Sequence, residues 1–195
     1  MVGGTVTVLI PAIPTRTRML NRALVSVLNQ QRPPDRIVVS LDHDRLGAAG
    51  NRNQALKGVT TEWVAFLDDD DELMPHHLLV LLQNSDDADV IYTGCQVLGP
   101  AGEEVEPLEE WGRFGKPFDG LLLRKKSYLP VTSLVRVEYL KDIAEPFKAP
   151  RDSAYDDWGM YLQLLDNDAR FKHVPQKTWI WNHWGGNTSG RADRW

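Results

Sequence analysis

The chain of 195 residues has little cysteine, no long apolar run and no excess of basic residues. Its single cysteine, Cys95, cannot form a disulfide within the chain, so we expect a small buried side chain and a reducing, cytoplasmic setting. The apolar run at residues 6–13 is too short to cross a membrane and follows no basic region, which predicts neither a transmembrane segment nor a signal peptide. A net charge of −5 disfavours a strong nucleic-acid footprint.

The length and the composition fit one soluble globular domain over residues 1–195. β-branched runs at residues 5–10 and 37–41 flank an amphipathic helical pattern at residues 20–28, and a third apolar run follows at residues 63–67. Strand, helix and strand in this order predict a right-handed βαβ unit and a parallel, doubly wound sheet. Further strands are expected at residues 89–93, 128–137, 171–175 and 177–184. Residues 99–120, rich in Gly, Pro and Glu, predict an excursion within the domain.

Four consecutive aspartates, residues 68–71, follow the third apolar run directly. Carboxylates at this density raise one another's pKa, so they need solvent or a divalent cation to stay ionised. An EF-hand calcium loop is excluded, because counting from Asp68 places Leu73 at its glycine position and Leu79 at its glutamate position. A purely solvated loop remains the plain alternative. Pro75 predicts the first turn of a following helix, with His76 and His77 at its surface.

A second alternative is an aspartyl phosphohydrolase, which also places an Asp-x-Asp pair at a strand end. In that interpretation Asp68 is the nucleophile. The residue two positions after the second aspartate is usually Thr or Val in such enzymes, and here it is Glu72. The pattern therefore favours this class less than the one below.

The segment from Phe66 to Pro75 resembles the Asp-x-Asp motif of family 2 glycosyltransferases of the GT-A fold. Three further segments resemble motifs of the same family, in the expected order: Gly50-x-Arg52-Asn53, Asp156-Asp157-Trp158, and His183-x-x-x-Asn187-x-Ser189. The resemblance covers nearly the whole chain. It implies an α/β, GT-A (Rossmann-like) single domain with a mostly parallel central sheet flanked by helices. Residues 1–93 would form the nucleotide-binding half, and residues 94–195 the acceptor and catalytic half.

The resemblance also assigns residues to a nucleotide-sugar donor. Pro11 and Ala12 would line the base pocket, and Asp42 would accept the N3 hydrogen of uracil, which an ionised carboxylate can do. Asp44 is an alternative for this contact, and a turn-forming role is an alternative for Asp42. Arg52 would face the diphosphate or hold Asp68 in place, unless it lies on a surface helix.

The metal and catalytic residues are implied in the same way. Asp70 would hold the cation, and Asp68 or Asp69 would reach the ribose or the cation. His183 would join the metal shell, and because imidazole suits Mn²⁺ better than Mg²⁺, manganese is the first choice and magnesium the second. Asp157 would be the catalytic base and Asp156 an acceptor-holding or orienting residue, although acidic residues also favour a helix start for electrostatic reasons alone.

Together these assignments predict a metal-dependent, inverting glycosyltransferase that uses a nucleotide sugar, with a UDP-sugar as the expected donor. Neither the sugar nor the acceptor can be read from the sequence. A nucleotide-sugar-binding module without transfer activity is the alternative from another class.

Overall fold

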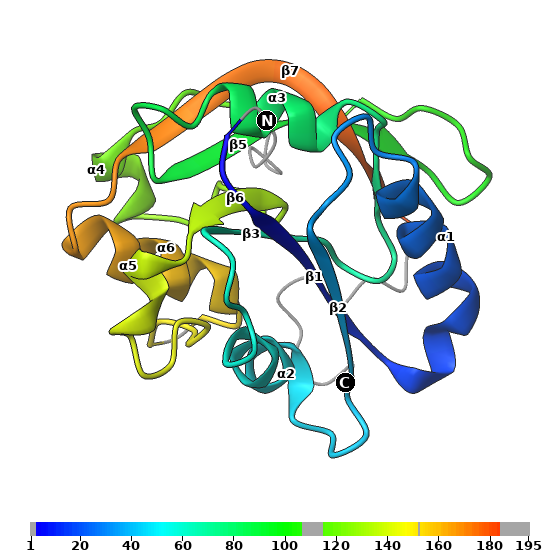
Figure 1. The fold of residues 1–195 in the computed structure, drawn as a ribbon, viewed down its shortest axis with the longest axis horizontal. Helices are drawn as coiled ribbons and strands as arrows, with labels where there is room; N and C mark the ends of the chain where they lie inside the picture. Colours follow the sequence, from blue (N-terminus) through cyan, green and yellow to red (C-terminus); the bar gives the residue numbers. More distant parts are fainter. Residues whose placement is uncertain (1–2, 107–114, 152, 184–195) are drawn as a thin grey trace.

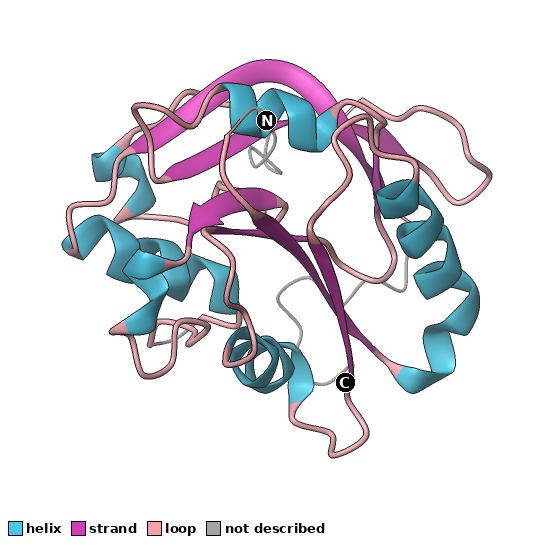
Figure 2. Cartoon of the chain, viewed as in Figure 1, coloured by secondary structure: helices cyan, strands magenta, loops and turns pink. Residues whose placement is uncertain are grey.

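The computed structural model describes residues 3–106, 115–151 and 153–183. These residues form a seven-stranded sheet with helices packed on both faces (Figures 1 and 2). The strand order across the sheet is β2-β1-β3-β6-β5-β7-β4. The strands are β1 (Val6–Ala12), β2 (Arg36–Leu41), β3 (Trp63–Phe66), β4 (Glu72–Leu73), β5 (Val90–Leu98), β6 (Ser133–Arg136) and β7 (Phe171–Asn182). The helices are the 3-10 turn η1 (Pro14–Arg16), α1 (Thr17–Leu28), α2 (Gly47–Leu56), α3 (His77–Gln83), α4 (Gly120–Leu123), α5 (Glu138–Lys141) and α6 (Asp156–Asp166).

The sheet is mixed, with most strands in one direction. β1 is parallel to β2 and β3, β6 is antiparallel to β3 and β5, β7 is parallel to β5, and β4 is antiparallel to β7. It follows that β2, β1, β3, β5 and β7 share one direction, while β6 and β4 run the other way. The predicted α/β fold with a mostly parallel central sheet is confirmed.

The core lies on both faces of the sheet, because β1 is buried along its whole length. Val6, Val8 and Ile10 pack with the apolar sides of α1 and α3 on one face. Leu9 packs on the opposite face with residues of α2, α4, α5 and α6. In Figure 1, α1 lies beside β2, and α2, α5 and α6 lie together on the other side of the central strands. The helices packed on the two faces hold in place the strand ends that form the site.

Four strands differ from the prediction. The short strand β4 lies between the aspartates and α3, where a direct passage into the helix was expected, and it pairs with β7. The strand expected at residues 128–137 is confined to β6. The two C-terminal strands are one, β7, because a bulge opposite Gly94 lets it pass Pro175 without a break. β5 continues to Leu98, well beyond the expected end at residue 93.

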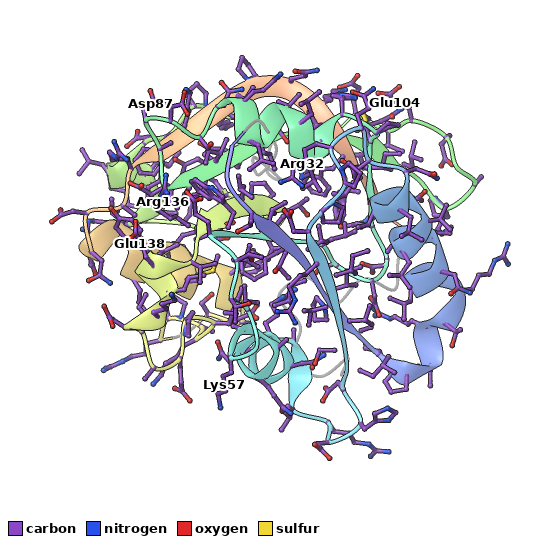
Figure 3. The ribbon with its side chains drawn as sticks, in the orientation of Figure 1. Arg32, Lys57, Asp87, Glu104, Arg136 and Glu138 are labelled. Carbon is purple, nitrogen blue, oxygen red and sulfur yellow. The ribbon has the colours of Figure 1, made fainter. Side chains whose placement is uncertain are left out.

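The beginnings of β5 and β7 and the end of β6 are joined by one buried carboxylate. Asp89 is 2% exposed and accepts hydrogen bonds from Arg136 and from the backbone and side chain of Arg170. The guanidinium of Arg136 also lies 4.1 Å from the centre of the Trp63 ring. Its Nε lies 3.8 Å from Oε1 of Glu138. Figure 3 labels Arg136 and Glu138 next to each other. Burial acts to raise the pKa of Asp89, but the Arg170 hydrogen bonds prevail and the pKa lies below its usual range.

Two smaller expectations have clear outcomes. Cys95 is buried at 2% exposure, and burial raises the pKa of its thiol, which confirms it as a packed side chain. The surface position expected for His77 is wrong, because the side chain is fully buried beneath β7. Among the described residues, no helix has both the length and the apolar character needed to cross a membrane.

Candidate active site

The candidate site lies at the carboxyl ends of β1, β2 and β3. Because these strands are parallel neighbours, their carboxyl ends meet at one edge of the sheet. Ile13 and the turn η1 follow β1, Asp42 follows β2, and residues 68–71 follow β3. The beginning of α6 meets the same edge, because Asp156 is paired with Arg52 of α2. Segments far apart in the sequence are therefore gathered at one place.

Arg52 connects the acidic loop, residues 68–71, to the acidic pair of α6, Asp156 and Asp157. It is 5% exposed, and its Nη1 donates to Oδ2 of Asp156 at 2.8 Å while its Nη2 donates to Oδ1 of Asp68. Burial acts to lower the pKa of Arg52, but the charges of the two aspartates prevail and raise it, so the guanidinium stays charged. The surface-helix alternative for Arg52 is wrong. Of the two arrangements expected, the structure shows the one in which Arg52 holds Asp68.

The residues around Arg52 keep it in this place. The ring of Phe147 lies 5.3 Å from the guanidinium and meets the ring of Phe66 edge-on at 5.1 Å. The side chain of Asn53 accepts a hydrogen bond from the Phe147 nitrogen and donates one to the Phe147 oxygen, each at 2.9 Å. The loop that precedes α6 is thereby fixed to α2. The motif residues Arg52 and Asn53 thus have complementary roles, one holding carboxylates and the other holding the backbone beside them.

The acidic loop contains a group of carboxylates with the geometry of a cation site. Ligand atoms of Asp68, Asp70 and Asp71 all lie within 4.8 Å of one another. Asp71 is buried, and burial together with the negative charges of Asp70 and Asp68 raises its pKa well above the usual range. Clustered carboxylate oxygens fit a hard divalent cation, which would relieve their repulsion. The expected metal ligand Asp70 belongs to this group, and Asp71 rather than Asp69 completes it.

Asp69 has partners in the segment that follows β1. Its Oδ2 accepts a hydrogen bond from the Ile13 nitrogen at 2.9 Å, and its Oδ1 accepts one from Nη1 of Arg16 at 3.1 Å. The same nitrogen of Arg16 lies 3.5 Å from Oδ2 of Asp70. Burial raises the pKa of Asp69, although these donors and the positive charge oppose the shift. Asp69 therefore ties the acidic loop to the segment after β1.

Asp42 has the contacts of a turn-forming residue. Its carboxylate accepts hydrogen bonds from the nitrogens of Leu46 at 2.7 Å and Gly47 at 2.9 Å, and Gly47 has a φ of +74° that favours glycine. Its own nitrogen donates to the Ala12 oxygen at 2.9 Å, which places Ala12 and Asp42 side by side as the base pocket requires. A carboxylate has further lone pairs, so the uracil contact stays a prediction. Asp44 is exposed.

The two acids of α6 have different surroundings. Asp156 is paired with Arg52, whereas Oδ1 of Asp157 accepts a hydrogen bond from the Trp158 nitrogen in the same turn at 2.9 Å. Trp158 in turn donates from Nε1 to the Leu123 oxygen at 2.6 Å, which fixes the beginning of α6 against α4. The buried guanidinium of Arg52 thus fixes the orientation of the Asp156 carboxylate. This difference agrees with Asp157 as base and Asp156 as the orienting residue, an assignment that stays a prediction.

His183 follows the last residue of β7. Its nitrogen donates to the Leu98 oxygen at 2.7 Å, and its ring lies 4.9 Å from that of Trp181. For the residues that the structure describes, the group of possible metal ligands that lie within 4.8 Å of one another consists of Asp68, Asp70 and Asp71, and His183 does not belong to it. A place for His183 in the metal shell remains a prediction. The motif residues Asn187 and Ser189 lie outside the described residues.

Three residues of the site were not predicted from the sequence. Arg16 and Asp71 are described above, and Asn182 is the third. The backbone nitrogen of Asn182 donates to Oδ1 of Asp71 at 3.0 Å, and its Nδ2 donates to the backbone oxygen of Asp70 at 2.9 Å. The end of β7 therefore supports the acidic loop. A basic residue just after the first strand was a usable signal for Arg16. The contact of Asn182 spans more than a hundred residues and has no local signal in the sequence.

The fold and this edge define an α/β protein in which a group of carboxylates that could hold a cation is joined through Arg52 to the acidic pair of α6. Residues 24–144 match the family model described as glycosyl transferase family 2, and the chain belongs to this family. The class of protein predicted from the four motifs is confirmed.

Two curated relatives carry glycosyltransferase names. The chain is 29% identical over 124 residues to GalNAc(5)-diNAcBac-PP-undecaprenol beta-1,3-glucosyltransferase of Campylobacter jejuni, a match covering 63% of this chain and 37% of that protein. It is 20% identical over 160 residues to an uncharacterised glycosyltransferase of Methanocaldococcus jannaschii, a match covering 80% of this chain and 54% of that protein. The chain thus spans about half or less of the length of these relatives.

Solved structures of S. aureus TarS share the fold. The crystal structure of TarS residues 1–349 has a TM-score of 0.66 with 16% identity, covering 91% of this chain and 60% of that one. The same fragment in complex with UDP-GlcNAc has a TM-score of 0.64 with 17% identity, covering 91% and 58%. A further structure of the fragment contains UDP. At this identity the likeness establishes the fold, which is GT-A-like as expected.

Proposed function

We propose that this chain transfers a sugar from a UDP-sugar to an acceptor with inversion at the anomeric carbon, assisted by a divalent cation. The observation that carries the proposal is the bridge from Asp68 through the buried guanidinium of Arg52 to Asp156. This bridge joins the carboxylates that we propose hold the cation to the acidic pair that we propose takes the proton. Family membership and the fold shared with UDP-bound TarS support the same activity.

The acidic loop would hold the cation. Asp68, Asp70 and Asp71 supply the oxygen ligands, and the cation would stabilise the negative charge of the leaving diphosphate. Mn²⁺ is the cation we propose, because His183 follows β7 close in sequence to Asn182, which supports the loop. Arg52 keeps Asp68 in place and neutralises part of the acidic charge.

Asp157 would take the proton of the acceptor hydroxyl as its oxygen attacks the anomeric carbon and the bond to the diphosphate oxygen breaks. One displacement assisted by one base inverts the configuration. Asp156, held by Arg52, would orient the acceptor. The uridine would lie against Pro11 and Ala12 with its imide directed to Asp42. We propose a cytoplasmic location, in keeping with the single buried Cys95.

Replacing Asp157 by Asn tests the assignment of the base. We expect release of UDP from UDP-sugars to fall at least about a hundredfold, because the variant lacks a proton acceptor at the same position. The affinity for UDP, measured by calorimetry, should change less than threefold. Asp166→Asn is the control, because Asp166 ends the same helix, is largely exposed and pairs only at the surface with Arg124.

A near wild-type rate for Asp157→Asn would remove Asp157 from the role of base. If the wild-type protein binds UDP-sugars but neither transfers the sugar nor slowly hydrolyses the donor, the chain is instead a nucleotide-sugar-binding module without activity. Release of phosphate from generic phosphomonoesters, lost on changing Asp68, would indicate the phosphohydrolase.

A further inference from the structure

Arg16 lies in the turn η1, directly after β1, and reaches into the acidic loop. Its Nη1 is 3.1 Å from Oδ1 of Asp69 and 3.5 Å from Oδ2 of Asp70, and its side chain is only 13% exposed. One guanidinium nitrogen is therefore shared between neighbouring carboxylates in a largely buried place. No motif assigned to the family above includes this residue.

The two carboxylates that Arg16 contacts are not equivalent. Asp69 forms a hydrogen bond with Arg16, is held in addition by the Ile13 nitrogen, and does not belong to the carboxylate group suited to a cation. Asp70 belongs to that group, and its Oδ2 lies 3.5 Å from the same nitrogen of Arg16. The contact with Asp69 thus anchors the arginine, whereas the contact with Asp70 would compete with a cation bound to that carboxylate.

This geometry has an electrostatic consequence. A guanidinium beside Asp70 satisfies part of the charge that would otherwise attract a divalent cation, and it repels a cation bound to the same carboxylate. A diphosphate offers the guanidinium another anion with which it can form paired hydrogen bonds. A diphosphate that drew the guanidinium away from Asp70 would release this carboxylate to the cation, while Asp69 would keep Arg16 anchored.

We propose that Arg16 is an internal counter-ion of the acidic loop and makes cation binding depend on the nucleotide diphosphate. Arg16 is a positioning residue in this scheme, because it acts on the cation through Asp70. The proposal rests on the proposed donor site, since the anion that draws Arg16 away from Asp70 is the diphosphate of that donor.

The test is a set of calorimetric titrations of the wild type and Arg16→Gln. MnCl₂ is titrated alone and in saturating UDP, and the ratio of the two dissociation constants gives the coupling between the ligands. In the wild type we expect weak binding of Mn²⁺ alone and a large ratio. In Arg16→Gln we expect Mn²⁺ alone to bind roughly tenfold more tightly, about 1.4 kcal/mol, and the ratio to fall by a similar factor.

Two further variants act as controls. Arg22→Gln removes the same charge from an arginine that lies 3.6 Å from Glu72 and is 45% exposed, so both dissociation constants should match the wild type. Arg16→Lys keeps a positive charge and should retain most of the coupling, and it also serves if Arg16→Gln does not fold. Thermal melting in EDTA verifies that each variant is folded, and Mn²⁺ alone should raise the Tm of Arg16→Gln more than that of the wild type.

The outcomes separate this inference from the proposed function. If the wild type binds UDP and Mn²⁺ cooperatively and Arg16→Gln shows the same affinities and coupling, the role of Arg16 is overturned and the donor site stands. Loss of coupling in Arg22→Gln as well as in Arg16→Gln would also contradict it, because the effect would then be one of general charge. If the wild type binds neither ligand, both the donor site and the role of Arg16 are overturned.

Discussion

His77 shows how a single buried residue sets a pH limit on this fold. Its Nδ1 lies 2.7 Å from Oγ1 of Thr178, which lies 2.6 Å from Oγ1 of Thr93, and its Nε2 has no hydrogen-bond partner within the described part of the chain. Burial lowers the pKa of His77 to about 3, with the neighbouring charge of His76 adding to the shift. The imidazole is therefore neutral in the folded protein at all ordinary pH values.

This pKa predicts a loss of stability in acid. Above about pH 6.5 both the folded and the unfolded chain carry neutral His77, so it has no effect on stability. Below that pH only the unfolded chain binds the proton, and the free energy of unfolding falls by up to about 1.4 kcal/mol per pH unit until about pH 3. In His77→Asn, whose amide can still meet Thr178, urea unfolding between pH 7 and 4.5 should show a shallower decline than the wild type. Parallel declines would contradict the buried neutral histidine.

At the residue scale, the sequence predicted those site residues that share a local pattern. Asp68 and Asp70 follow an apolar strand, and Asp156 begins a helix, so each has a signal in its own neighbourhood. The different roles of Asp69 and Asp71 have no such signal. They depend on tertiary contacts, because Arg16 binds Asp69 and Asn182 binds Asp71. His77 was placed wrongly for the same reason, since the strand that covers it lies a hundred residues away in the chain.

At the scale of elements, the position of α6 depends on close contact with the loop before it. A Cβ placed on Gly159 would lie 1.7 Å from the Lys148 oxygen, so any side chain there must push the helix and the loop apart. The same helix carries Asp156 and Asp157 in its first turn. The absence of a side chain at residue 159 is thus a condition for the acids to reach the edge of the sheet.

Gly159→Ala should therefore impair both stability and turnover. We expect the free energy of unfolding to fall by about 1–3 kcal/mol through overpacking, and UDP release from UDP-sugars to fall at least tenfold because the acids are displaced. UDP affinity should change little, since the acidic loop belongs to another element. The control is Gly58→Ala, where the nearest atom to the added Cβ is the Ala55 oxygen at an ordinary 3.6 Å. Wild-type turnover in Gly159→Ala would contradict this placement of α6.

The elements themselves were predictable where periodicity was strong. The apolar runs of β1, β2 and β3 and the amphipathic pattern of α1 gave their positions to within a few residues. β4 was not predicted, because two residues carry no periodicity and this strand exists only through its pairing with β7. The bulge that keeps β7 continuous likewise depends on its partner β5.

At the scale of the whole molecule, the two expected halves of the chain share one sheet and one core, and a small set of polar contacts joins them at the site. Arg52 and Asn53 on α2 hold Asp156 and the backbone of Phe147, and Asn182 at the end of β7 holds Asp70 and Asp71. The division into a nucleotide-binding half, residues 1–93, and a catalytic half, residues 94–195, stays a proposal. The order of the motifs along the chain predicted the fold, whereas the contacts between halves are tertiary and were not predictable.

The central claim is that the acidic loop holds a cation for a uridine diphosphate donor. Calorimetric titration of UDP with and without Mn²⁺, on the wild type and Asp70→Ala, tests it most directly. The alanine variant keeps the backbone oxygen that accepts from Asn182, so the loop retains its support, and Asp87→Ala, at an exposed position, controls for the lost charge. We expect UDP binding that requires Mn²⁺, is at least tenfold weaker in Asp70→Ala and is unchanged in Asp87→Ala. UDP binding that is indifferent to Mn²⁺ and to Asp70, or no UDP binding at all, would contradict the account.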